Sequence, residues 1–193
     1  MNTQPSIELI IGPMYSCKTS ELMRILTIYS TANFKALYIN SNIDTRVNGG
    51  EQTFSTHNKS LKNNKDITMV KTDHLNDVFD LCQKFDVIAI DEAQFFGGLY
   101  DFCTRLCDVE KKKVIVAGLS GTSDRKAFGE ITSLIPVCDN VTFLSAFCSV
   151  CALAKKIERA VFSMRLVHSE NESVVAVGGL ETYIPVCRNH FFS

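Results

Sequence analysis

Short apolar runs alternate with longer amphipathic stretches along most of this 193-residue chain. The apolar runs, which are rich in Ile, Val and Ala, predict buried β-strands at 8–11, 35–40, 67–70, 87–91 and 113–118. Apolar residues at helical spacing predict α-helices at 19–29, 74–84 and 99–110. Because strands that alternate with helices form βαβ units, we expect an α/β fold with a mainly parallel sheet flanked by helices.

The pattern changes in two places. Residues 42–66 are polar and carry little periodicity, which predicts a long loop of the kind that often serves as a functional lid. After about residue 141 the helical periodicity stops, and alternating runs at 160–167 and 173–177 indicate a small β-rich unit. We therefore expect two domains, comprising residues 1–143 and 144–193.

Composition narrows the range of functions. A hydrophobic content of 46% is enough for a globular core, and a net charge of −1 argues against nucleic-acid binding as the main activity. No run is long and apolar enough for a membrane span, and the first residues do not resemble a secretory signal. A cytoplasmic protein is expected, in which eight cysteines serve as thiols or metal ligands rather than disulfides.

The first candidate site follows the first predicted strand. It reads Gly-Pro-Met-Tyr-Ser-Cys-Lys-Thr and precedes a predicted helix, which is the setting of a phosphate-binding P-loop. The candidate ATP-binding residues of this loop are Gly12, Pro13, Met14, Tyr15, Ser16, Cys17, Lys18 and Thr19. Lys18 would reach the β- and γ-phosphates, and the Thr19 hydroxyl would ligate Mg²⁺. The alternative is an ordinary strand-to-helix turn with a solvated lysine.

One position departs from the P-loop pattern. Cys17 stands where glycine is usual, directly before the lysine. If the backbone there needs a positive φ, a residue with a Cβ would cost about 1–2 kcal/mol.

A second candidate site ends the strand predicted at 87–91. Asp91 is placed as in a Walker B motif, to hold Mg²⁺ directly or through water, and the P-loop belongs at the same edge of a parallel sheet. Glu92 could accept a proton from an attacking oxygen, either of water or of a substrate hydroxyl. A second metal ligand or a solvated helix cap are the other roles open to Glu92.

A third candidate site spans the C-terminal region. Two short motifs, CxxC and CxxH, supply Cys148, Cys151, Cys187 and His190. Such gaps let both side chains of a turn reach one tetrahedral ion, and four protein ligands predict a structural zinc. The alternative is four reduced residues that never meet. The other cysteines are scattered, and most of them are expected in the core: Cys17, Cys82, Cys103, Cys107 and Cys138.

Taken in order, these motifs resemble those of the thymidine kinases shared by animal cytosol, many bacteria and large DNA viruses. The resemblance covers nearly the whole chain. It includes Asp-Glu-Ala-Gln-Phe-Phe at 91–96, Gly-Leu-Ser-Gly-Thr-Ser-Asp-Arg-Lys-Ala-Phe at 118–128, and Val-Cys-Arg-Asn-His at 186–190. It implies a RecA-like P-loop fold and ATP-dependent phosphorylation of the thymidine 5′-hydroxyl, with Glu92 as general base.

The resemblance also implies roles for further residues. Asp91 and Gln94 would join the ATP site, and Asp44 would lie near the magnesium together with Thr19 and Asp91. Residues expected around the nucleoside are Met14, Arg46, Phe95, Leu119, Phe128, Ser163, Ala176, Gly178 and Tyr183. Relatives of this type are usually homotetramers inhibited by thymidine triphosphate.

Three departures from the family pattern leave nucleoside selectivity open: Ser120, Ser123 and Ala127. Two other functions compete with the kinase. A nucleic-acid-dependent ATPase or helicase would also combine a P-loop with an Asp-Glu pair, although such enzymes generally use two ATPase domains. A non-catalytic nucleotide-binding or zinc scaffold protein would result if Cys17 disabled the loop.

Overall fold

A computed structural model describes residues 3–43, 67–166 and 182–192 of the chain. Its centre is a six-stranded sheet in the order β3-β2-β4-β5-β1-β6, and every neighbouring pair is parallel. The strands are β1 (Ser6–Gly12), β2 (Ala36–Ser41), β3 (Ile67–Thr72), β4 (Val87–Ile90), β5 (Lys113–Leu119) and β6 (Asn140–Phe143). The five strands predicted for the sheet are all confirmed, whereas β6 was not predicted.

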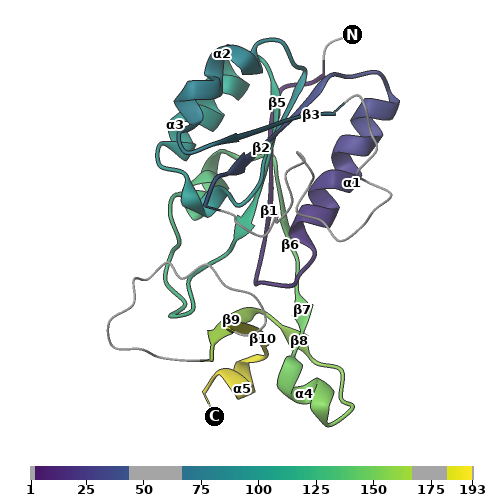
Figure 1. Ribbon diagram of the computed structural model, residues 1–193, viewed down its shortest axis with the longest axis vertical. Helices are drawn as coiled ribbons and strands as arrows, with labels where there is room; N and C mark the ends of the chain where they lie inside the picture. The colour runs from purple at the N-terminus through teal and green to yellow at the C-terminus, as the bar shows by residue number, and fades with distance from the viewer. Residues whose placement is uncertain (1–2, 44–66, 167–181, 193) are drawn as a thin grey trace.

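Helices cover both faces of the sheet (Figure 1). The long helix α1 (Lys18–Thr31) packs on one face, and shorter elements cover the other. These shorter elements are η2 (Leu75–Val78), α2 (Phe79–Cys82), α3 (Leu99–Thr104), η4 (Arg105–Val109) and η5 (Ile131–Val137). The continuous α-helices predicted at 74–84 and 99–110 are therefore wrong in detail, since the first begins as a 3₁₀ turn and the second ends as a π turn.

Alternate residues of each central strand point to opposite faces. In β1, Ile10 packs toward α1 and its residues Leu22 and Leu26, whereas Leu9 and Ile11 pack against the other layer. This double burial explains the continuous apolar runs in the sequence. It also leaves the carboxyl ends of the strands as the edge from which the site loops project. No helix in the described part of the chain combines the length and the apolar character that crossing a bilayer requires.

A smaller unit lies beyond the carboxyl ends of the strands, at the bottom of Figure 1. It contains two antiparallel pairs, β7 (Ala146–Phe147) with β8 (Arg159–Ala160), and β9 (Phe162–Arg165) with β10 (Tyr183–Val186). Its described residues also include two short helices, α4 (Ser149–Leu153) and α5 (Arg188–Phe191). The run predicted at 160–167 is split between β8 and β9, and the one at 173–177 lies outside the described residues.

Candidate active site and metal centre

The loop between β1 and α1 is held closed by hydrogen bonds across its own interior. The Ser16 hydroxyl donates to the Pro13 carbonyl at 2.8 Å, and the Lys18 ammonium donates to the same oxygen at 2.7 Å. Gly12 is required here, because a Cβ would lie 2.5 Å from the backbone oxygen of Leu144. The buried lysine therefore points inward across the loop, where a phosphate group would sit, rather than into solvent.

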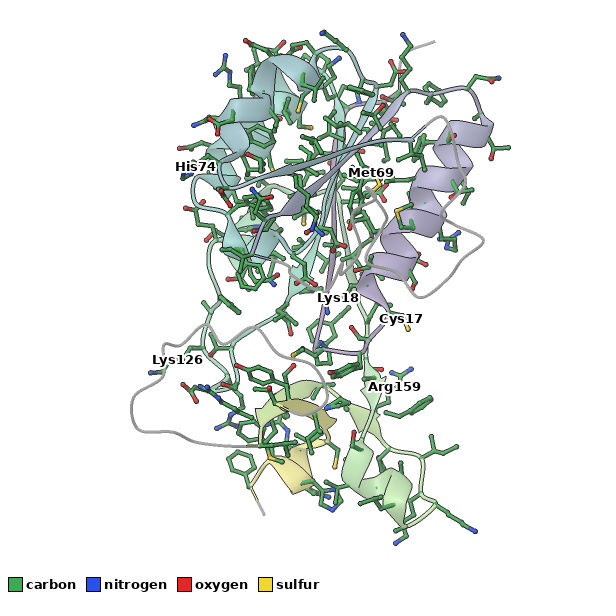
Figure 2. All side chains as sticks on the ribbon, in the orientation of Figure 1. Cys17, Lys18, Met69, His74, Lys126 and Arg159 are labelled. Carbon is green, nitrogen blue, oxygen red and sulfur yellow. The ribbon has the colours of Figure 1, made fainter. Side chains whose placement is uncertain are left out.

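Cys17 has a left-handed backbone conformation, with φ of 63°. Glycine, the usual residue at this position of a P-loop, adopts that conformation without strain. It directly precedes α1, and its carbonyl accepts the first helical hydrogen bond, from the Glu21 amide at 3.0 Å. The thiol is exposed at the start of the helix (Figure 2). Of the cysteines expected in the core, Cys17 is thus an exception, while Cys82, Cys103 and Cys107 are buried.

Asp91 lies at the end of β4 and is completely enclosed. Its carboxylate accepts hydrogen bonds from the Tyr38 hydroxyl at 2.7 Å, from the Glu92 amide at 2.9 Å, and from the Thr19 hydroxyl. Burial and the neighbouring Glu92 charge raise the pKa of Asp91 to about 6, and the hydrogen bonds oppose that rise. The contact with Thr19 brings the two predicted magnesium ligands together.

These two groups suit a magnesium ion. Both offer hard oxygen donors, and a nearby cation would favour the ionised form of Asp91 that burial disfavours. The third expected ligand, Asp44, lies outside the described residues, as does Arg46.

Glu92 is buried beside Asp91 and has a left-handed backbone, with φ of 49°. The Gln94 side-chain amide donates to Glu92 Oε2 at 2.7 Å, and Gln94 Oε1 accepts from the Leu119 amide at 3.0 Å. Gln94 therefore connects the candidate base to the end of β5. The contact of Gln94 with ATP stays a prediction.

Several residues expected around a nucleoside are paired across the site. The rings of Phe95 and Phe128 meet edge to face with centroids 5.7 Å apart. The Met14 amide of the P-loop donates to the Ser163 hydroxyl of β9 at 2.9 Å, which links the sheet to the smaller unit. Tyr183 is buried in β10. Ala176 and Gly178 lie outside the described residues.

The cysteines and histidine of the smaller unit converge on one point. Their ligand atoms all lie within 4.8 Å of one another: Cys148, Cys151, Cys187 and His190. His190 Nδ1 is 3.3–3.5 Å from each of the three sulfurs, and the Cys151 and Cys187 sulfurs are 4.0 Å apart. Tetrahedral zinc bonds give separations of about 3.5 Å between sulfur and nitrogen and about 3.8 Å between sulfurs. The cluster therefore has the dimensions to hold zinc.

A bound cation would also favour the ionised form of these thiols. Burial disfavours the Cys148 thiolate, but backbone hydrogen bonds from Cys151 and Cys187, together with one from His190, lower its pKa to about 6. Burial and the hydrogen bonds with its cysteine neighbours raise the pKa of Cys151 to about 12. Three adjacent thiolates repel one another unless a metal offsets their charge.

Comparison with known proteins agrees with this geometry. The family model described as "Thymidine kinase" matches residues 5–191. The chain belongs to the thymidine kinase family. It is 38% identical to the thymidine kinase of Amsacta moorei entomopoxvirus over 95% of this chain and 96% of the relative. It is also 38% identical to that of Myxoma virus (strain Uriarra), over 96% of each chain. The cytosolic thymidine kinase of Bos taurus is 36% identical over 98% of this chain and 73% of its own length.

Within this thymidine kinase fold, the structure adds two contacts that the sequence reasoning missed. The first is the Tyr38 hydroxyl on Asp91. A tyrosine between apolar residues of a buried strand was the available signal, because a buried hydroxyl needs a partner. The second is the bridging position of Gln94, for which the sequence carries no separate signal.

Proposed function

We propose that this protein transfers the γ-phosphoryl group of ATP to the 5′-hydroxyl of thymidine. The observation that carries the proposal is the contact of the Asp91 carboxylate with the Thr19 hydroxyl and the Glu92 amide at the carboxyl end of β4, with the buried Lys18 directly before Thr19 in the chain. Membership of the thymidine kinase family supports thymidine as the acceptor.

The phosphate side of the reaction would depend on positioned charge. Amides of the P-loop and the Lys18 ammonium would bind the phosphates, with Lys18 leaving the Pro13 carbonyl for a phosphate oxygen. Thr19 and Asp91 would hold Mg²⁺, which supplies neutralisation of phosphate charge when bound.

Glu92 would act as the general base. It would accept the proton of the 5′-hydroxyl as that oxygen bonds to the γ-phosphorus and the bond to the β,γ-bridging oxygen breaks. The hydrogen bond from Gln94 to one oxygen of Glu92 supports this role, because it fixes the orientation of the carboxylate. Its burial supports exclusion of water, the competing acceptor.

The nucleoside would lie between the Phe95–Phe128 pair and the P-loop. Met14, Leu119, Ser163 and Tyr183 belong to the same proposed pocket, and the Met14–Ser163 hydrogen bond supports a joint role for the two domains. We place the domain boundary between residues 143 and 144, and we assign a structural zinc to the second domain. A cytoplasmic homotetramer inhibited by thymidine triphosphate is proposed from the family likeness alone.

One experiment tests the reaction. The purified protein is incubated with ATP and Mg²⁺ and, separately, each common deoxynucleoside, and monophosphates are separated chromatographically. We expect thymidine monophosphate, with ADP formed in equal amount. ATP hydrolysis that is stimulated by DNA or RNA, without any nucleoside monophosphate, would instead identify an ATPase.

A further inference from the structure

A tight turn carries Arg125 at the tip of the loop between β5 and η5. The Thr122 amide donates to the Lys126 carbonyl at 2.9 Å, and the Arg125 amide donates to the Thr122 carbonyl at 3.0 Å. The Lys126 amide also donates to the Thr122 hydroxyl at 3.2 Å. These bonds close residues 122–126 into a compact turn, from which the Arg125 side chain projects.

The Arg125 side chain reaches from this turn to the smaller unit. Its guanidinium carbon is 4.4 Å from the ring centroid of Phe192, 4.6 Å from that of Phe191, and 5.8 Å from that of Phe162. The rings also contact one another, Phe191 with Phe192 at 5.5 Å and Phe191 with Phe162 at 5.2 Å. A planar cation over aromatic faces is an attractive and directional contact.

Two of the three aromatic partners pack beside the candidate metal centre. Phe162 and Phe191 pack against the buried cluster that includes Cys148, Cys151 and Cys187. Phe191 also directly follows His190 in α5. Arg125 therefore rests on side chains fixed beside the four candidate ligands.

The other parts of the same loop lie against the catalytic residues. At its start, the Leu119 amide donates to Gln94, and the Ser120 amide donates to the Gly12 carbonyl at 3.2 Å. Near its end, Phe128 packs on Phe95. Both ends of the loop therefore contact residues of the candidate active site, and Arg125 contacts the smaller unit.

We infer that Arg125 is a positioning residue for the nucleoside. Its contacts with Phe191 and Phe192 fix the loop so that Leu119 and Phe128 keep the shape of the nucleoside pocket. This inference rests on the proposed kinase function. If Arg125 has this role, the affinity for thymidine depends on how the smaller unit packs against the loop, whereas the affinity for ATP does not.

The backbone at Arg125 supports a role for the side chain. Its φ of 60° lies in the left-handed region, which glycine adopts without strain. A turn that required only this conformation would be better served by glycine. The strained arginine is thus explained by what its guanidinium contacts.

Because glycine adopts the left-handed backbone of position 125 without strain, substitutions there can separate the role of the side chain from that of the backbone. Arg125→Gly relieves the backbone while removing the guanidinium, Arg125→Lys restores a cation, and Phe192→Leu removes one exposed ring. Lys126→Ala is the control, because it removes an exposed cation from the same turn, which Figure 2 labels. For each full-length variant we would measure KM for thymidine and for ATP, kcat, the thermal midpoint, and thymidine binding by calorimetry.

We expect Arg125→Gly to raise the thymidine KM and Kd about 5-fold, with the ATP KM and the thermal midpoint nearly unchanged. Arg125→Lys should recover part of this loss. Phe192→Leu should raise the thymidine KM, and adding it to Arg125→Gly should have little further effect. Normal thymidine KM in Arg125→Gly, equal losses for ATP and thymidine, or a Lys126→Ala effect of similar size would overturn the inference. Wild-type protein that forms no thymidine monophosphate would instead refute the proposed function.

Discussion

The side-chain amide of Gln94 donates a hydrogen bond of 2.7 Å to the Glu92 carboxylate, and its oxygen accepts one from the Leu119 amide. Both groups of this buried amide are therefore used. The bond orients the proposed base and ties it to the end of β5, so the position of Glu92 depends on a neighbour that transfers no proton.

We expect Gln94→Leu to lower kcat about 10- to 100-fold, because the base loses its fixed orientation while the P-loop is intact. Gln94→Glu is the informative companion. It keeps an acceptor for Leu119 but places a second carboxyl against Glu92, which favours retention of a proton between them. The acid limb of the pH–rate profile should then move to higher pH. An unchanged profile in Gln94→Glu, with normal kcat in Gln94→Leu, would show that Glu92 needs no such support.

Glu92→Gln should lower kcat about 100- to 10,000-fold, since the amide cannot accept the hydroxyl proton. ATP binding, measured by calorimetry, should be nearly unaffected. Lys18→Ala provides the opposite pattern, because it removes a cation that the phosphates would contact, and ATP affinity should fall. Near-normal turnover in Glu92→Gln would assign this carboxylate to a cap or to the metal instead.

Cys17→Gly should preserve or raise ATP affinity, because the backbone already has the conformation that glycine adopts without strain. The gain in unfolding free energy is expected at up to about 1 kcal/mol, reduced by the greater freedom of glycine in the unfolded chain. Differential scanning fluorimetry with and without ATP would measure both effects. Lower ATP affinity in Cys17→Gly would indicate that the thiol itself contributes to binding.

Alkylation gives an independent test of the same position. The Cys17 thiol is exposed, whereas burial raises the pKa of Cys82 to about 12 and also raises that of Cys103. Iodoacetamide should therefore label Cys17 quickly and these two slowly, as read by peptide mass spectrometry. ATP with Mg²⁺ should protect Cys17, and labelling at an equal rate with and without nucleotide would place the thiol away from the phosphates.

The purified protein should contain about one zinc per chain, and chelation should lower its thermal midpoint. Cys151→Ser should reduce the zinc content measured by mass spectrometry, because it removes a ligand of the cluster. Cys138→Ser is the matched control, as this partly buried thiol lies outside the cluster. Full stability of zinc-free protein would contradict a structural metal.

The fold was largely predictable from the sequence, with errors of an identifiable kind. Strands buried on both faces give continuous apolar runs, and all of these were predicted. β6 was not predicted because it is an edge strand in which most residues are exposed. It also contains two polar residues, Asn140 and Thr142, so it gives no continuous apolar run. Helical periodicity located the segments at 74–84 and 99–110 but not their type, since it reports which face is buried and not which carbonyl each amide contacts.

The candidate site was predictable where its residues are neighbours in sequence. The P-loop and the Asp91–Glu92 pair follow from local motifs. The hydrogen bonds from Tyr38 to Asp91 and from Met14 to Ser163 join residues far apart in the chain. Such contacts depend on strand order and on how the smaller unit is seated, and neither is encoded in a local pattern.

Asp91 should carry a measurable cost in stability. Its folded-state pKa of about 6 lies above the ordinary value of 3.8, so ionisation at neutral pH opposes folding. That cost is absent below about pH 4, develops as the pH rises toward 6, and is constant above it, at no more than about 3 kcal/mol. Asp91→Asn removes the charge and should raise the unfolding free energy of the ligand-free protein by about 1–2 kcal/mol at pH 7.5, with little change near pH 4.

Urea unfolding of Asp91→Asn at both pH values would measure this difference, with Asp124→Asn as a control at an exposed carboxylate. The same variant should bind ATP with Mg²⁺ more weakly, because it loses an anionic oxygen ligand. Stability gained at pH 7.5 together with weaker nucleotide binding would mean that Asp91 is retained for the metal and not for the fold. A loss of stability at pH 7.5 would mean that the hydrogen bonds from Tyr38 and Thr19 outweigh the cost of the buried charge.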